Sequence, residues 1–208
     1  MNLAFWIFVS YLFGSIPTSY IVGRTFASKD LRKLGSKNLG ATNVYRVLGL
    51  KYAIPVALVD ITKGVIPVSL FARYAGSEPW IPITLGAAAV FGHVFSVFVR
   101  FRGGKGVATA SGAVLALAPM AFVVSLVVWI LAVTFTGYVS IGSILGALVF
   151  PAAARVVMPD DAYTFGVGLI LAAFIVFTHR TNIRRLALGT EHRFGKWRVG
   201  ASDRKSVV

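Results

Sequence analysis

The amino-acid sequence predicts an all-α, polytopic membrane protein, and two observations lead to this fold class. The 208 residues have a mean hydropathy of +0.78, with 57% hydrophobic and only 13% charged residues, whereas soluble domains carry about 25% charged residues. Apolar runs of about 20 residues, the length of a membrane-spanning helix, also separate three basic segments that hold 18 of the 21 lysines and arginines. Such runs are too apolar for a soluble surface.

The basic segments predict how the chain is oriented in the bilayer. Residues 24–51, 100–105 and 180–205 contain 7, 3 and 8 basic residues. Cytoplasmic loops of membrane proteins are enriched in lysine and arginine, so we expect all three segments inside, the N-terminus outside and the C-terminus in the cytoplasm. A net charge of +14 could also indicate nucleic-acid binding, but the apolar runs between the segments favour anionic head groups as the partner.

Four apolar runs have close to the length of one crossing: residues 3–23, 52–71, 79–99 and 162–178. The first could be read as a secretory signal peptide, but such peptides carry their positive charge before the apolar stretch. Here the charge follows the run, at Arg24. We therefore expect an uncleaved first helix.

The 49 residues from 106 to 154 carry no charge, and parity limits how they are threaded. They begin at Lys105, inside, and end at a weakly charged loop around residue 160 that the charge rule places outside. The number of crossings is therefore odd. Three crossings, with breaks near Pro119 and Gly137-Tyr138, give seven helices in total, whereas one crossing with a re-entrant pair gives five. We expect seven, some of them short, because each of the three has about 16 residues for a crossing that needs about 20.

The chain shows no internal repeat and no second domain. We expect residues 1–192 to form a single helical domain and residues 193–208 to form a basic cytoplasmic tail. Cysteine is absent, which excludes disulfides, thiolate nucleophiles and cysteine metal ligands. The three histidines lack the spacing of a metal site. The sequence therefore predicts no metal and no cofactor.

The first candidate motif lies in the first basic segment and reads GSKNLGATN, followed by Arg46. Glycines let backbone amides approach a ligand, hydroxyls and side-chain amides donate to phosphate oxygens, and an arginine can bind two oxygens at once. An ordinary polar turn that caps the next helix is the alternative. The candidate phosphate ligands here are Ser36, Asn38, Gly40, Thr42, Asn43 and Arg46.

The second motif reads RFRGGKGVAT and places Lys105 among glycines just before an apolar helix. A helix N-terminus offers amides and a partial positive charge to an anion. The string is not a nucleotide P-loop, since Val99 and Gly106 stand where that pattern requires Gly and Ser or Thr. We expect Lys105 and the amides of residues 103–106, including Gly103, Gly104 and Gly106, to bind phosphate. A tight turn with a snorkelling lysine is the alternative.

The third motif lies where the last apolar run ends. His179 and Asn182 share a helix face at a spacing of three residues, and Arg184, Arg185 and Glu191 follow. A basic anchor at the membrane interface is the alternative. Within the second apolar run, Asp60 and Lys63 lie one turn apart, either as functional groups or as an ion pair that holds helices together.

Together the strings resemble one family, the bacterial membrane-bound acyl-phosphate:glycerol-3-phosphate acyltransferases. The resemblance runs from residues 10–17, SYLFGSIP, to Glu191. The family pattern GSGNxGATNxxR is matched except at Lys37, which replaces a glycine. The pattern GHxxPVFxxFxGGKGVAT is matched through Thr109 except at Ser96, which replaces a proline. Neither an H-x-x-x-x-D signature nor a G-x-S-x-G elbow is present.

The resemblance implies transfer of a fatty acyl group from acyl phosphate to the 1-hydroxyl of sn-glycerol 3-phosphate, which gives lysophosphatidic acid for phospholipid synthesis. It also implies seven helices, an external N-terminus and an active site on the cytoplasmic face of a bacterial plasma membrane. The expected partners are the two substrates and membrane lipids, with no nucleic acid and no obligate protein partner. The resemblance also implies that Thr109, the last residue of the second pattern, binds substrate.

The residues suggest a mechanism without a covalent intermediate, because an acyl phosphate is already activated. Binding two phosphates side by side and placing a hydroxyl near a carbonyl would then suffice. We expect Lys105 with the glycine amides to hold one phosphate, and Arg46 with Ser36, Thr42 and Asn43 to hold the other. His179, the only imidazole expected beside another motif residue at the cytoplasmic end, could accept the proton. We favour the substrate phosphate as acceptor, with His179 and Asn182 positioning the substrate.

A transporter or exchanger of small organic phosphates is the alternative function. Such a protein would also need a basic inner site and polar breaks in its helices. It should expose its site to both membrane faces, yet the expected outer loops, residues 72–78 and 155–161, have one arginine each and no anion-binding string. The enzyme is therefore the preferred interpretation.

Overall fold

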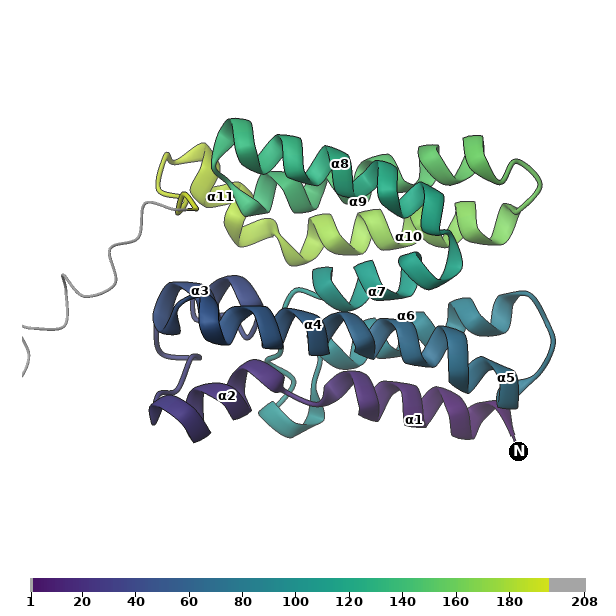
Figure 1. The fold of residues 1–208 in the computed structure, drawn as a ribbon, viewed down its shortest axis with the longest axis horizontal. Coiled ribbons are helices and arrows are strands. Elements are labelled where there is room, and N and C mark those ends of the chain that lie inside the picture. The colour runs from purple at the N-terminus through teal and green to yellow at the C-terminus, as the bar shows by residue number, and fades with distance from the viewer. Residues whose placement is uncertain (1, 195–208) are drawn as a thin grey trace, which may run out of the picture.

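The computed structural model describes residues 2–194, and in this part of the chain every regular element is helical (Figure 1). The C-terminal tail predicted for residues 193–208 therefore lies mostly outside the described residues. The elements are α1 (Leu3–Ser15), α2 (Thr18–Ala27), α3 (Ala41–Leu48), α4 (Leu50–Ile66), a π-helical turn (Pro67–Phe71), α5 (Ala72–Ala75), α6 (Trp80–Val94), a 3₁₀ turn (Val97–Val99), α7 (Val107–Leu117), α8 (Pro119–Thr136), α9 (Val139–Val157), α10 (Ala162–Thr178) and α11 (Arg180–Ala187).

Several helices are long and apolar enough to cross a membrane, which confirms the fold class. Among the described residues five spans meet this test, and α10 and α11 meet it only together, as a pair bent by 56°. Helix α7 has only 11 residues and is too short for a crossing by itself. The uncharged stretch is divided at Pro119 and Gly137-Tyr138, where the sequence predicted its breaks.

The helices form two groups with α7 between them (Figure 1). Helices α1, α4 and α6 lie in one group, α8, α9 and α10 in the other, and α7 packs closely on α4. Glycines make that contact possible. A Cβ on Gly64 would lie 1.9 Å from the carbonyl oxygen of Thr109, and one on Gly112 would lie 1.9 Å from that of Ile61. Small residues allow such backbone contact between membrane helices, and here they hold α7 in place.

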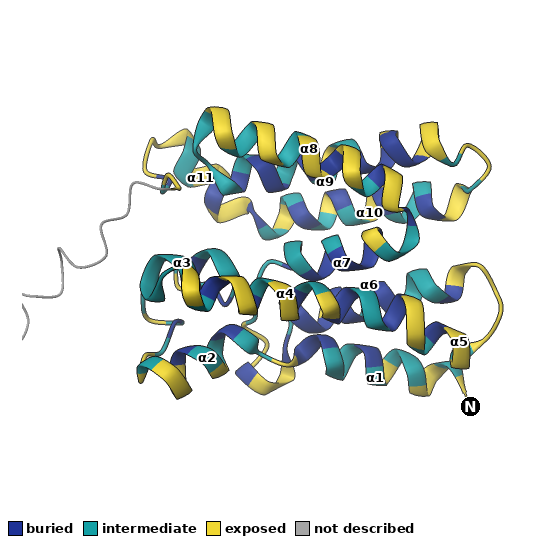
Figure 2. Cartoon of the chain, in the orientation of Figure 1, coloured by how far each residue is buried: buried dark blue, intermediate teal, exposed yellow. Residues whose placement is uncertain are grey.

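Many large apolar side chains are exposed, as expected of a surface that faces lipid, and Figure 2 marks exposed positions along the outer helices. Phe135 and Ile170, for example, are 82% and 70% exposed. A soluble monomer rarely exposes apolar patches of this extent. Buried polar residues such as Asn43, Thr109 and His179 lie inside.

The first span is broken at Ile16 and Pro17, between α1 and α2. Proline has no N–H to donate, so the helix ladder is interrupted there. The Nζ atom of Lys63 donates to the Ile16 carbonyl (2.6 Å) and to the Thr18 hydroxyl, and it lies 2.6 Å from a carboxylate oxygen of Asp60. The intramembrane ion pair therefore ties α4 to the break.

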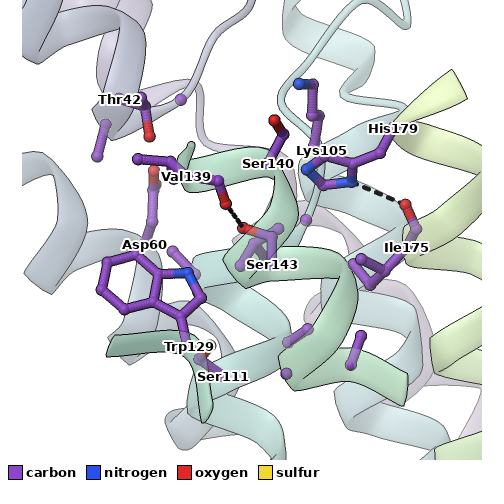
Figure 3. Close-up of a pocket in the computed structure, with 18 of the residues that line it drawn as sticks. Thr42, Asp60, Lys105, Ser111, Trp129, Val139, Ser140, Ser143, Ile175 and His179 are labelled. Carbon is purple, nitrogen blue, oxygen red and sulfur yellow. Dashed lines mark hydrogen bonds between the residues drawn. The ribbon is translucent and has the colours of Figure 1, made fainter. Parts of the chain in front are cut away.

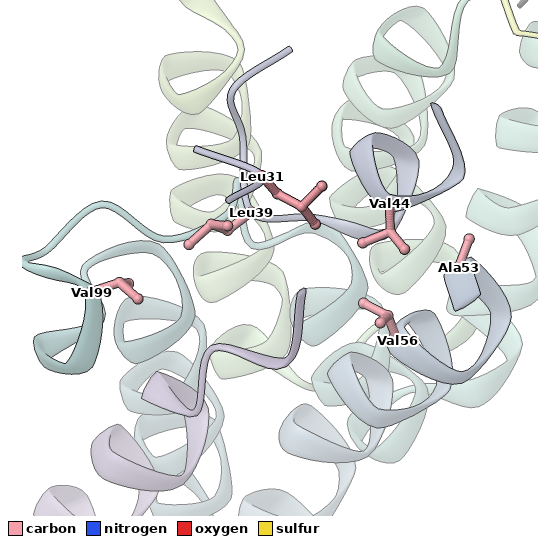
Figure 4. Close-up of a cluster of buried hydrophobic side chains, with 6 residues drawn as sticks. All are labelled: Leu31, Leu39, Val44, Ala53, Val56 and Val99. Atoms are coloured by element: carbon pink, nitrogen blue, oxygen red, sulfur yellow. The ribbon is translucent and has the colours of Figure 1, made fainter. Parts of the chain in front are cut away.

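The loops that carry the first two motifs share a small apolar core (Figure 4). Its buried members are Leu31, Leu39, Val44, Ala53, Val56 and Val99. They come from the loop before α3, from α3 and α4, and from the 3₁₀ turn before the glycine string. This cluster anchors both loops at the end of the bundle where α2, α3 and α11 also lie (Figure 1).

Candidate functional site

A cavity of about 370 Å³ at this end of the bundle brings the three motifs together (Figure 3). The loop after α2 and helix α3 contribute the first motif, the turn before α7 contributes the second, and the bend between α10 and α11 contributes the third. The candidate site residues that line the cavity, with Glu191 of the third motif, are Ser36, Asn38, Gly40, Thr42, Asn43, Arg46, Lys105, Gly106, His179 and Asn182.

Lys105 is held at this cavity by a hydrogen-bonded chain. Its Nζ atom donates to the side-chain oxygen of Asn182, whose amide nitrogen donates to Glu191 at 2.6 Å. Glu191 also accepts from Arg185 (2.6 Å) and from Ser140 (3.1 Å). Lys105 thus contacts a neutral amide, and its charge stays available to an anion.

Burial and hydrogen bonding shift the pKa values of the charged side chains around Lys105. Burial lowers the pKa of Lys105 to about 8, although the nearby Glu191 carboxylate opposes this shift. Burial also lowers the pKa of Arg46. Burial alone would raise the pKa of Glu191, but the hydrogen bonds from Arg185 and Asn182 bring it below its ordinary value. The acid is therefore ionised at neutral pH.

Glu191 and Ser140 are functional candidates outside the predicted site set. Glu191 was noticed as part of the third motif, and it is the single carboxylate among the arginines of residues 180–193, a signal that could have identified it. Ser140 lies in an apolar helix, and its sequence context gives no such signal. Only the packing of α9 against the end of α10 places it beside Glu191.

The glycine turn differs from its predicted role. The amide of Gly103 donates to the Val94 carbonyl (3.0 Å) and that of Gly104 to the His93 carbonyl (3.1 Å), so both amides are already paired within the chain. A Cβ on Gly103 would lie 1.9 Å from the His93 carbonyl oxygen. These two glycines therefore permit a close backbone contact with the end of α6. Within the described part, the amides of Lys105 and Gly106 donate to no other oxygen.

Two further predicted ligands have structural roles. Thr109 is fully buried on α7, whose backbone contacts α4 at this residue, and it does not line the cavity, so its assignment as a substrate ligand stays a prediction without support from its position. Asn43 reaches the cavity, but its side-chain oxygen accepts from the Ser36 amide (2.8 Å) and its nitrogen donates to the carbonyls of Leu31 and Leu34 (3.2 Å each). Asn43 therefore positions the first motif rather than donating to phosphate.

Two imidazoles line the cavity, which corrects the expectation of one. His93, on α6, contributes to the wall, and its Nδ1 atom lies 3.9 Å from a carboxylate oxygen of Asp60. The signal was present in the sequence, because His93 belongs to the string that carries Lys105. The Asp60 carboxylate lines the cavity as well (Figure 3).

His179 lies in the bend between α10 and α11, outside both helices. Its Nδ1 atom lies 2.8 Å from the Ile175 carbonyl oxygen (Figure 3). A carbonyl can only accept, so Nδ1 carries the hydrogen and Nε2 is the acceptor of the neutral ring. Burial, together with the Lys105 cation, lowers the pKa of His179 to about 4. The ring is therefore neutral at physiological pH.

Away from the cationic end the cavity is walled by apolar side chains. They come from α7, α8, α9 and α10 and include Val114, Phe122, Leu126, Trp129, Phe150 and Leu171. The indole of Trp129 and the hydroxyl of Ser143 lie along this part in Figure 3. An amphipathic ligand with an anionic head and an apolar chain matches such a cavity.

The fold and the cavity define a helical membrane protein with a cavity at one end of its bundle that is cationic on one side and apolar along the rest. The comparisons with known proteins narrow this class. Residues 4–189 match the family model described as glycerol-3-phosphate acyltransferase, and the chain belongs to this family.

Curated relatives and solved structures agree with this assignment. The glycerol-3-phosphate acyltransferase of Chlorobaculum parvum is 44% identical over 90% of this chain and 95% of its own length. That of Fusobacterium nucleatum is 41% identical over 92% of this chain and 99% of its own length. The crystal structure of PlsY, an integral membrane glycerol 3-phosphate acyltransferase, superposes with a TM-score of 0.87 in its glycerol 3-phosphate form, at 38% identity over 93% of this chain and 96% of that one. Its lysophosphatidic acid form superposes with a TM-score of 0.83, at 36% identity over 93% of this chain and 95% of that one.

Proposed function

We propose that this protein transfers an acyl group from acyl phosphate to the 1-hydroxyl of sn-glycerol 3-phosphate and releases lysophosphatidic acid. The observation that supports this most is the cavity itself, where Lys105 and Arg46 lie at one end and apolar walls extend from it. An acyl phosphate has a chain for the walls and an anion for the cations. The structures of PlsY with glycerol 3-phosphate and lysophosphatidic acid support the second substrate and the product.

The proposed reaction needs no covalent enzyme intermediate. The glycerol hydroxyl oxygen attacks the acyl carbonyl carbon, the bond from that carbon to the phosphate oxygen breaks, and phosphate leaves with the electron pair. Lys105, its own amide and the amide of Gly106 stabilise one phosphate, while Arg46, Ser36 and Thr42 hold the other, with Asn38 and Gly40 beside them. Cations at such positions keep two anions together and stabilise the charge that develops on the leaving group.

We assign the proton of the attacking hydroxyl to a phosphate oxygen of the substrate. His179 Nε2 is the acceptor of the neutral ring and has no hydrogen-bond partner among residues 2–194, but a ring with a pKa of about 4 is a weak base. A phosphate monoester has its second pKa near 6 and is a better match for the task. His179 and Asn182 then position the substrate.

Replacing His179 by alanine should therefore lower kcat by less than about tenfold, because the proton acceptor remains. Steady-state assays of the purified variant measure this. Gly166→Ala is a suitable control, since a Cβ at that position meets nothing within 4 Å. A loss of more than about a thousandfold in His179→Ala would show that the imidazole is the base.

The pKa of Lys105 gives the expected pH dependence. Because it lies at about 8, the ammonium loses its proton as pH rises through 8, and kcat/KM for glycerol 3-phosphate should fall above that pH. The substrate phosphate is already a dianion there. In Lys105→Arg the guanidinium stays charged, so the remaining activity should not decline between pH 7 and 9.5. An alkaline decline of equal size in both proteins would contradict the assignment to Lys105.

We also propose the topology that the sequence predicted. Seven membrane helices, with α7 as the short one, place the N-terminus outside and the cavity on the cytoplasmic side of a bacterial plasma membrane. Since the chain contains no cysteine, Ser77→Cys and Lys33→Cys test this. A membrane-impermeant thiol reagent should label Ser77→Cys in intact cells and Lys33→Cys only after the cells are broken. The opposite pattern would invert the topology.

The reaction is tested with the full-length protein purified in detergent. Palmitoyl phosphate and glycerol 3-phosphate should give lysophosphatidic acid and inorganic phosphate in equal amounts. A parallel assay replaces palmitoyl phosphate by palmitoyl-CoA and measures release of free CoA. Product from the CoA ester at a comparable rate, or no product from the acyl phosphate, would overturn the proposed donor.

A further inference from the structure

A second cavity, of about 330 Å³, lies beside the first one. It is formed by the first basic loop, the glycine turn and the beginning of α11. Ser36, Asn38 and Lys105 line both cavities. Lys105 therefore lies where the two meet.

The wall of the second cavity is strongly cationic. Its charged members are Lys37, Arg102, Lys105, Arg180 and Arg185, and none of the described lining residues is acidic. Arg185 is neutralised by Glu191, at 2.6 Å. Within the described part of the chain, Lys37, Arg102 and Arg180 make no salt bridge. The cavity thus presents uncompensated positive charge.

Local contacts hold one of these cations, Arg180, in position. The guanidinium of Arg180 lies 4.5 Å from the ring centroid of Phe177 and donates to that residue's carbonyl oxygen at 3.2 Å. Lys37 has a φ of +61°, a left-handed conformation that is unfavourable for a residue with a Cβ. Backbone strain of this kind is often found at functional sites. Lys37 is exposed and lines the cavity.

The chemistry of the proposed reaction assigns an occupant to this cavity. Two of its four compounds, acyl phosphate and lysophosphatidic acid, carry a chain and fit the apolar walls of the first cavity. The other two, glycerol 3-phosphate and inorganic phosphate, are small, water-soluble anions. The lysine and arginines in the wall of this cavity attract such anions from solution.

We infer that the second cavity is the site through which glycerol 3-phosphate reaches Lys105 and inorganic phosphate leaves. This inference rests on the proposed function. It makes Lys37, Arg102 and Arg180 determinants of affinity for the soluble phosphates, since they line only this cavity. They should not affect the acyl donor.

The test uses the full-length protein with Lys37→Gly, Arg102→Gln and Arg180→Gln, singly and combined. Each exposed cation contributes modestly, so the KM for glycerol 3-phosphate should rise about twofold to fivefold in each variant and more than about tenfold in the triple variant. The inhibition constant of inorganic phosphate should rise in parallel. The kcat and the KM for palmitoyl phosphate should stay within about twofold, as expected when binding alone is lost.

Arg155→Gln is the matched control. It removes the same charge from an exposed position near the end of α9 that lines neither cavity. If the wild type is active and the triple variant has the same KM for glycerol 3-phosphate as Arg155→Gln, the inference is wrong. A rise in the KM for palmitoyl phosphate instead would also overturn it, because the cavity would then serve the lipid donor.

A failed reaction would not leave the site untested. If the wild type makes no lysophosphatidic acid, the proposed function is wrong. Calorimetric titration with inorganic phosphate then tests whether the second cavity binds anions. Weaker phosphate binding by the triple variant than by Arg155→Gln would support an anion site. Equal phosphate binding by the triple variant and Arg155→Gln would show that the second cavity is not an anion site.

Discussion

Lys105→Ala should lower kcat/KM by about a thousandfold or more. Lys105 is the cation at the junction of the two cavities, and within residues 2–194 its Nζ atom donates to a neutral amide, that of Asn182, and forms no salt bridge. Its charge therefore acts on the phosphates. Loss of a single preorganised donor costs about a hundredfold to a thousandfold in other enzymes, and here a full charge in a largely buried site is lost as well. Initial rates of lysophosphatidic acid formation measure the effect.

The fold should survive this substitution. Burying a cation that has no directly contacting carboxylate is unfavourable, so the thermal stability of Lys105→Ala should be equal to that of the wild type or higher. Lys51→Ala serves as the control, because Lys51 is exposed at the start of α4 and lines neither cavity. A well-folded Lys105→Ala protein that keeps a tenth of wild-type activity would refute the proposed mechanism.

The sequence was sufficient to predict the helical membrane class and the convergence of the motifs. Hydropathy and charge act over whole segments, so residues 162–178 were delimited as α10 is observed. The breaks at Pro119 and Gly137-Tyr138 were predicted because proline and glycine act on the local backbone. The motifs meet because all three follow helices that end on the same side.

The roles of individual motif residues could not be read in the same way. A glycine string can offer its amides to a ligand or allow another backbone to approach, and Gly103 and Gly104 do the latter, since His93 and Val94 accept their hydrogens. The direction of a side chain on a helix depends on which neighbour packs there. The Thr109 side chain is fully buried and outside the cavity lining for this reason, and the Ser140 hydroxyl donates to Glu191.

Gly103→Ala should abolish most activity although Gly103 is not expected to touch the substrate. Its amide donates to the Val94 carbonyl, and a Cβ would lie 1.9 Å from the backbone oxygen of His93. Neither atom can move without shifting the end of α6, so the turn itself must move and carry Lys105 with it. A displacement of about 1 Å can cost a hundredfold in rate, and we expect a loss of at least that size in kcat/KM.

The matched control is Gly166→Ala, because a Cβ there contacts nothing within 4 Å, and its activity should equal that of the wild type. The pH profile separates displacement of Lys105 from loss of the fold. If the turn has moved and Lys105 has gained solvent, its pKa rises from about 8 toward the ordinary lysine value near 10.4. The alkaline decline of the residual activity should then shift upward by at least one pH unit. Full activity, or reduced activity with the decline still near pH 8, would show that the contact between the glycine turn and α6 does not position Lys105.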